Sequence, residues 1–260
     1  MKQLAERIKP YFQLLRIGNL LFIAILLYVM EKWVATPLLQ LAQFYEQMPW
    51  WVLTLLIMST ICIAAGGYII NDYFDVKIDR INHPEDLVVT RYISREGAMR
   101  LFQVLTILGV IMGLVVAWWA RSWTLVMIFI VIPGLLWFYS ASYKRQLVIG
   151  NIVVAFISAI VPLLVAIANA DYLCHLYQEN LVYSPIVGQL YVWTSGFSLF
   201  AFLITLAREM VKDIEDKEGD QEMECRTIPI VWGDKITKII VSIILIITAA
   251  LITYIAFYIL

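Results

Sequence analysis

The chain of 260 residues is 62% hydrophobic and only 15% charged, and its 19 basic and 20 acidic residues leave a net charge of −1. A soluble domain is about 45–50% apolar and about 25% charged, so this composition excludes one, and a disordered chain needs the opposite balance. A nucleic-acid-binding protein would carry a basic excess, so we expect no nucleic-acid partner. The composition therefore predicts a membrane protein that crosses the bilayer several times.

Seven apolar stretches are long enough to cross the bilayer core, which needs about 20 residues of helix. They cover residues 10–30, 50–70, 101–120, 123–139, 147–168, 186–207 and 239–260. Backbone groups in lipid must be satisfied within a helix or a closed barrel, and these stretches lack the alternation of barrel strands. The predicted fold class is all-α, a polytopic transmembrane helical bundle in which residues 1–260 form a single domain.

The basic residues lie almost entirely on one side of the predicted membrane. Lys32 and Arg121 are the exceptions, and the other Lys and Arg fall before the first stretch, at its start, or in the second–third, fourth–fifth and sixth–seventh connections. Connections rich in Lys and Arg stay in the cytoplasm. We therefore expect an integral, multi-pass membrane protein whose N-terminus and acidic connections are cytoplasmic.

Two acidic motifs follow the second and the sixth stretch. The first places Asn71, Asp75 and Asp79 at i, i+4 and i+8, which is one face of a helix. The second places Asp213, Asp216 and Asp220 at i, i+3 and i+7, again on one helix face. Carboxylates at these spacings repel one another unless a cation lies among them.

Such a cation fits Mg²⁺, which typically binds one or two carboxylates together with substrate phosphates. Two acidic motifs on one side of an apolar bundle indicate a diphosphate held between them, with the charge of the departing diphosphate neutralised by the metal. The bundle beneath would hold a hydrocarbon tail. These features predict the ionisation of an isoprenyl diphosphate at a membrane surface.

At these residues the chain resembles the UbiA superfamily of intramembrane prenyltransferases. The N-D-x-x-D-x-x-x-D and D-x-x-D-x-x-x-D patterns of that superfamily are matched by Asn71, Asp72, Asp75 and Asp79, and by Asp213, Asp216 and Asp220. The resemblance implies a central cavity that opens to the cytoplasmic side and a Mg²⁺-dependent transfer of a prenyl group to an acceptor. Members commonly have nine spans, so this chain would lack the last two helices.

Within the superfamily, residues 78–84, 208–216 and 227–230 look most like the geranylgeranylglyceryl-phosphate geranylgeranyltransferase branch. The expected partners are an isoprenyl diphosphate, a glyceryl-phosphate acceptor and membrane lipids. An aromatic acceptor, such as a quinone precursor, is the alternative. Two more distant alternatives are a cation transporter and a CDP-alcohol phosphotransferase, although the D-G-x-x-A-R element of the latter is missing.

The resemblance and the residue chemistry together assign the candidate site. The expected Mg²⁺ ligands are Asn71, Asp75, Asp216 and Asp220. The residues expected to support the site or to accept a proton are Asp72, Asp79 and Asp213. The expected substrate-binding residues are Arg16, Asn19, Lys77, Arg80, Tyr139, Lys144, Arg208 and Lys212. His83, in the turn after the first motif, is expected to be a solvated loop residue.

Overall fold

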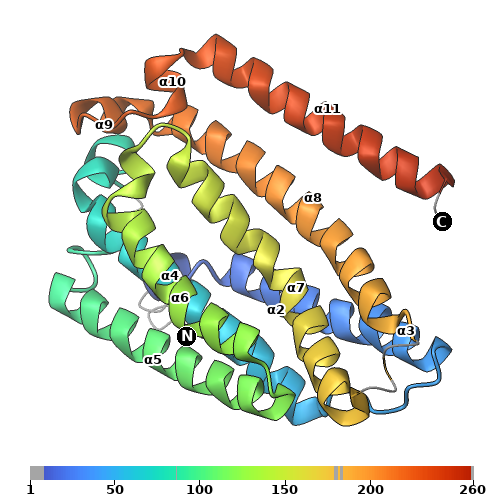
Figure 1. Cartoon of the computed structure of the whole chain (residues 1–260). Coiled ribbons are helices and arrows are strands. Elements are labelled where there is room, and N and C mark those ends of the chain that lie inside the picture. The colour runs from blue at the N-terminus through green and yellow to red at the C-terminus, as the bar shows by residue number, and fades with distance from the viewer. Residues whose placement is uncertain (1–8, 86, 179–180, 182–183, 259–260) are drawn as a thin grey trace.

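The computed structural model describes residues 9–85, 87–178, 181 and 184–258, and within them the regular structure is helical (Figure 1). The elements are α2 (Ile17–Val29), the π-helix η1 (Met30–Ala35), α3 (Thr36–Leu41), α4 (Trp50–Asn82), α5 (Arg95–Ala120), α6 (Trp123–Ala141), the 3₁₀ turn η2 (Tyr143–Arg145), α7 (Ile149–Tyr177), α8 (Ile186–Glu215), α9 (Lys217–Glu222), α10 (Ile228–Val231) and α11 (Asp234–Tyr258). The all-α prediction is confirmed.

Seven helical segments of the described chain are long and apolar enough to cross a membrane, which confirms the predicted number. Several run further than their apolar stretch. The α4 helix continues to Asn82 and α8 to Glu215, so both carry part of an acidic motif as helix. The last two residues of the predicted seventh stretch, 259–260, lie outside the described residues.

The prediction of one helix over residues 10–30 is wrong at both ends. Residues 9–14 are helical, but the chain then turns at Arg16, whose φ of 49° is left-handed, before α2 begins. The first candidate span then runs through η1 and α3 to Leu41. Glu31 follows the predicted end directly, yet its side chain is buried and accepts hydrogen bonds from Asn169 Nδ2 at 2.8 Å and Thr36 Oγ1 at 3.3 Å.

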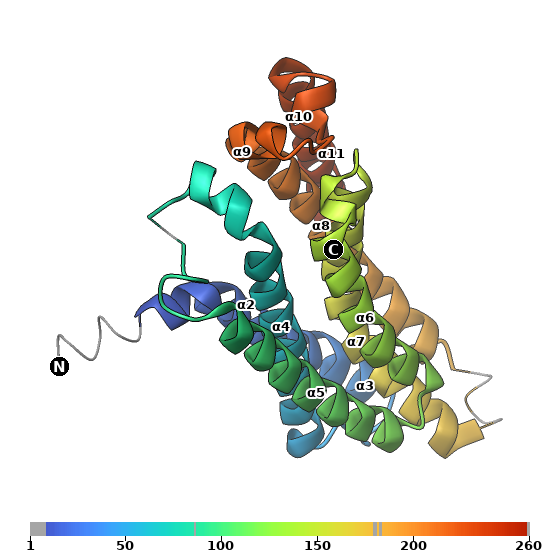
Figure 2. The ribbon, with the colours of Figure 1, turned by 90° about the vertical axis from the view of Figure 1, so that its left-hand side faces the viewer.

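The helices form two groups that meet at one end of the molecule and diverge toward the end that carries α9 and α10 (Figure 2). The helices α2, α4 and α5 lie on one side and α6, α7 and α8 on the other, while α11 packs along α8. The largest buried cluster joins the groups at the end opposite the acidic motifs, through residues such as Leu27, Leu56, Leu125, Leu164 and Ile186. This core closes one end of the bundle and leaves the motif end open.

The α4 helix is longer than a membrane requires. Its 33 residues span about 50 Å at 1.5 Å per residue, whereas the hydrocarbon core is about 30 Å thick. The acidic residues lie in its last third, from Asn71 onward. This length lets one continuous helix line the apolar bundle and carry the first motif beyond it.

Candidate active site

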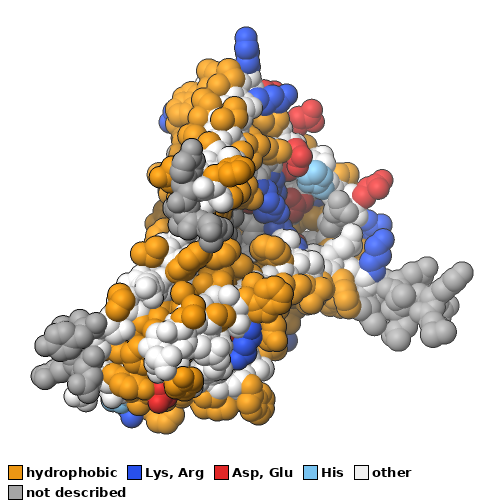
Figure 3. All heavy atoms as spheres, turned by 90° about the vertical axis from the view of Figure 1, so that its right-hand side faces the viewer, with side chains coloured by type: hydrophobic (Ala, Val, Ile, Leu, Met, Phe, Trp, Pro, Cys, Tyr) orange, Lys and Arg blue, Asp and Glu red, His pale blue; other side chains and the backbone are white. Residues whose placement is uncertain are grey.

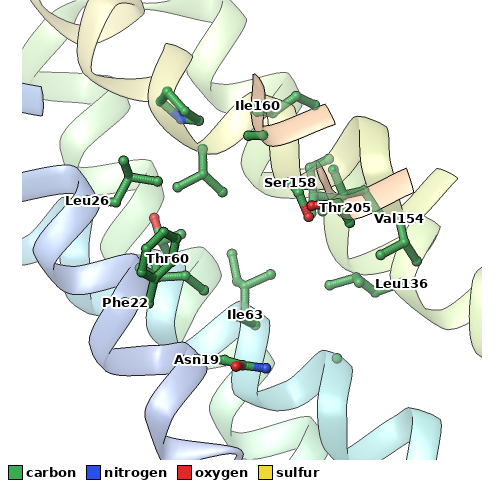
Figure 4. A pocket seen from close by; sticks show the side chains of 18 of the residues that line it. Asn19, Phe22, Leu26, Thr60, Ile63, Leu136, Val154, Ser158, Ile160 and Thr205 are labelled. Carbon is green, nitrogen blue, oxygen red and sulfur yellow. The ribbon is translucent and has the colours of Figure 1, made fainter. Parts of the chain in front are cut away.

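A cavity of about 570 Å³ lies between the two groups of helices, with walls from α2, α4, α6, α7 and α8. Figure 4 shows its apolar wall, where Phe22 and Leu26 of α2 face Ile63 of α4 and Ile160 of α7 across the space. A few neutral polar groups, including Thr60, interrupt this wall. Such a wall suits a hydrocarbon chain.

The polar lining of the cavity gathers toward the motif end. Arg16, Asn71, Arg208, Glu209 and Lys212 line it there. Figure 3 shows acidic, basic and histidine side chains together in a hollow of this part of the surface, whereas much of the same face is hydrophobic. The space therefore joins an apolar interior to a charged mouth, as an amphiphilic substrate would need.

The first motif is continuous helix, as predicted, so Asn71, Asp75 and Asp79 share one face of α4. The buried Asp75 carboxylate accepts hydrogen bonds from Asn71 Nδ2 at 2.7 Å and from Lys144 Nζ. Burial by itself would lower the pKa of Lys144, but the charge and hydrogen bond of Asp75, together with the charges of Tyr139 and Asp216, outweigh burial and the net shift is upward. Lys144 is therefore a permanent cation that the η2 turn places on the first motif.

The second motif is not one continuous helix, so that prediction is wrong. The α8 helix ends at Glu215, Asp216 forms the junction, and α9 begins at Lys217. The side chain of Asn82 fits this junction, because its Nδ2 donates to the Asp216 carbonyl and its Oδ1 accepts from the Gly219 N–H, each at 2.8 Å. The end of α4 thus holds the bend of the second motif.

The two motifs converge around buried carboxylates. Asp216 lies 3.0 Å from His83 Nε2 and 3.8 Å from Lys212 Nζ, so His83 is not simply a solvated loop residue. Burial raises the pKa of Asp220 to about 6; Lys144 opposes this rise, and the charges of Asp216 and Asp75 add to it. Asp75 of the first motif and Asp220 of the second therefore interact electrostatically.

The remaining predicted acids have different environments. Asp72 pairs with Arg16, Nη2 to Oδ1 at 3.0 Å. Asp213 accepts a hydrogen bond from Asn151 Nδ2 at 2.8 Å. The carboxylate of Asp79 has no hydrogen-bond partner among the described residues, and its charged neighbours include Asp75 and Lys144.

The predicted substrate-binding residues divide into two sets. Those that line the cavity are Arg16, Asn19, Tyr139, Arg208 and Lys212, and Lys144 contacts Asp75 beside it. Lys77 and Arg80 are exposed and are not among the described residues that line the cavity.

Sequence reasoning missed Glu209, which lines the cavity and pairs with Arg208 at 3.0 Å, and it missed the contacts of Asn82, His83 and Asn151. A buried acid in an apolar helix signals function, so Glu209 was detectable. The other contacts join residues more than sixty positions apart, and no local pattern signals them.

The chemistry of these side chains fits Mg²⁺. Within the described part of the chain, no three Asp, Glu, His or Cys side chains are close enough together to hold a metal ion. Asn71 Oδ1 is buried without a hydrogen-bond partner. Such an orphaned acceptor, beside the buried carboxylates of Asp75, Asp216 and Asp220, is the oxygen-rich environment that this cation prefers.

Comparison with known proteins bears on these expectations. The model of the UbiA prenyltransferase family matches residues 33–260. A digeranylgeranylglyceryl phosphate synthase of Methanobrevibacter smithii is 31% identical over 93% of this chain and 76% of its own length. The synthase of the same name from Sulfolobus acidocaldarius is 31% identical over 92% of this chain and 74% of its own length. The chain thus spans about three quarters of these relatives.

Two solved structures share the fold. One comes from a study of digeranylgeranylglyceryl phosphate synthase in membranes; it has a TM-score of 0.61 and 25% identity, and the match covers 95% of this chain and 76% of that one. The other is a UbiA homologue from Archaeoglobus fulgidus bound to DMAPP and Mg²⁺, with a TM-score of 0.60 and 15% identity over 94% of this chain and 76% of that one. None of these relatives is described as a transporter or a phosphotransferase. The chain belongs to the UbiA prenyltransferase family and is an intramembrane prenyltransferase.

Proposed function

We propose that the protein transfers a prenyl group from an isoprenyl diphosphate to the hydroxyl of a prenylated glyceryl phosphate. One observation carries this proposal: the end of α4, the helix of the first motif, contacts Asp216 of the second motif beside the charged mouth of an otherwise apolar cavity. The names of the relatives supply the acceptor class, since several are digeranylgeranylglyceryl phosphate synthases.

The diphosphate would bind where the motifs converge. We propose that Asn71, Asp75, Asp216 and Asp220 hold Mg²⁺, which when bound would neutralise the charge that grows on the departing diphosphate. Lys144 already neutralises the Asp75 carboxylate. This pairing would reduce the repulsion between the motif carboxylates and the diphosphate.

The apolar wall would hold the tail and keep water from the reacting carbon. The bond between C1 and the diphosphate oxygen breaks with its electron pair on the diphosphate, and the acceptor oxygen bonds to C1. The hydroxyl proton passes to a carboxylate, for which the candidates are Asp72, Asp79, Asp213 and the cavity-lining Glu209.

The test uses the full chain in lipid nanodiscs with labelled prenyl diphosphates and a panel of acceptors, and it reads product mass. We expect product only with Mg²⁺ present, and none from Asp75→Ala or Asp216→Ala. Glu222→Ala is the matched control, since Glu222 is an exposed acid on α9. Product from either aspartate variant would overturn the assigned site. Transfer to aromatic acceptors but not to glyceryl phosphates would overturn the proposed acceptor.

We also infer that the motif end faces the cytoplasm, because the basic residues concentrate there. Cys174 is exposed near the opposite end of α7, whereas Cys62 and Cys225 are buried. A membrane-impermeant maleimide should therefore label Cys174 in intact cells. Labelling only after the cells are permeabilised would reverse the orientation.

A further inference from the structure

A second groove, of about 540 Å³, lies where α11 packs against α8, beside the central cavity. Its apolar part comes from Ile204 of α8 and from Val241 and Leu245 of α11. At the motif end of α8 its lining includes Arg208 and Lys212. The groove therefore has a cationic end that continues into an apolar trough.

Ile204, Arg208 and Lys212, which share one face of α8, line both this groove and the central cavity. The last two are cations. Their side chains are one helical turn apart on α8 and form a cationic step between the two spaces. Neither is fully engaged: Arg208 is 59% exposed and contacts Glu209, and Lys212 lies 3.8 Å from Asp216. Both cations have donors left for a further anion.

The charge of the groove fits a single phosphate rather than a diphosphate with its metal. Glu215 also lines the groove, so its carboxylate offsets one of the two cations. The guanidinium of Arg208 matches two oxygens of a phosphate in a bidentate geometry. A lipid with one phosphate head and one long tail therefore complements the groove in both charge and polarity.

We propose that the groove between α8 and α11 binds the prenyl acceptor, a lipid phosphomonoester with a free hydroxyl, with its phosphate on Arg208 and Lys212 and its tail along Val241 and Leu245. This inference rests on the proposed function and adds the place of the acceptor. Donor and acceptor tails then lie next to each other, on either side of the row formed by Ile204, Arg208 and Lys212 on α8. Their reactive ends meet over the cationic step, which directs the acceptor hydroxyl toward C1 of the donor.

The full chain in nanodiscs provides the kinetic test, with the KM of each substrate measured separately. Leu245→Trp fills the groove at a position that is 45% exposed, and its neighbour Ile246, 68% exposed and outside the groove lining, gives the matched control Ile246→Trp. We expect Leu245→Trp to raise the acceptor KM by about tenfold or more while the donor KM changes less than about twofold. Ile246→Trp should change neither.

The proposal is overturned if Leu245→Trp leaves the acceptor KM unchanged, or if both KM values rise together. A binding experiment separates this result from a failure of the proposed function. Calorimetry with a deoxy analogue of the acceptor, which lacks the attacked hydroxyl, should show binding to the wild type and to Ile246→Trp but not to Leu245→Trp, whatever the turnover. Equal displacement of the analogue by phosphatidylglycerol would identify an ordinary lipid site and overturn the proposal.

Discussion

The amide of Asn82 joins the end of α4 to the bend in the second motif, and this link can be tested quantitatively. The two hydrogen bonds that Asn82 makes, to the Asp216 carbonyl and the Gly219 N–H, are worth about 1 kcal/mol each. Asn82→Ala should therefore destabilise the protein by about 2 kcal/mol, which lowers the Tm of a protein of this size by about 4–8 °C. The half-saturating Mg²⁺ concentration for transfer should rise, because Asp216 is no longer fixed against the first motif.

Gly219 supplies the second half of the test. A Cβ at this position would lie 2.7 Å from Asn82 Nδ2, a distance that forces the amide to move. Gly219→Ala should cost about 1–3 kcal/mol in the wild type. In the Asn82→Ala background the obstructing amide is gone, so the second substitution should cost much less and the two penalties should not add.

The assay follows thermal unfolding of the purified protein in detergent and the Mg²⁺ dependence of transfer for the wild type, both single variants and the double variant. Gln221→Ala, at an exposed position of α9, is the control that should change neither quantity. Strictly additive penalties would refute the direct contact between Asn82 and Gly219. An unchanged Mg²⁺ dependence in Asn82→Ala would refute its role in positioning the second motif.

Three further predictions concern buried polar contacts. Lys144→Met leaves the Asp75 carboxylate without its cation and should cost about 3–5 kcal/mol in thermal unfolding, with partial recovery in Lys144→Arg; an unchanged Tm would contradict the buried pair. Gly150→Ala places a Cβ 2.9 Å from the Lys144 Cα and should lower kcat by displacing that side chain, an expectation that wild-type turnover would rule out. Asn169→Ala removes the 2.8 Å hydrogen bond to Glu31 and should cost about 1–3 kcal/mol without changing the donor KM, because this pair lies at the end opposite the motifs; a raised donor KM would instead link it to the substrate.

Hydropathy alone predicts the seven spans because lipid forces each apolar stretch into a helix. It misplaces the C-terminal end of the first span because Glu31 and Lys32 interrupt the run of apolar residues. Glu31 is instead satisfied by Asn169, a partner 138 positions away that no local window contains. That residues 1–260 form a single domain stays a prediction.

Helical periodicity was sufficient for the first motif and insufficient for the second. Asn71 and Asp75 share a face of α4 because nothing interrupts the helix between them. The bend at Asp216 depends on Asn82, which lies 134 positions away, so spacing alone implies a straight helix that does not form. Periodicity also places Lys77 about 200° around α4 from Asp75, in agreement with its exposure.

The length of α4 has an energetic consequence for how substrate arrives. The helix is longer than the hydrocarbon core of the bilayer is thick, and its acids lie near one end. A prenyl diphosphate can therefore keep its diphosphate among the lipid headgroups and its tail in the hydrocarbon core throughout the reaction. Moving the tail into water would cost about 0.8 kcal/mol for each methylene group exposed. A site at this depth avoids that extraction, so the substrate can diffuse in from the leaflet and the product can return to it in the same orientation.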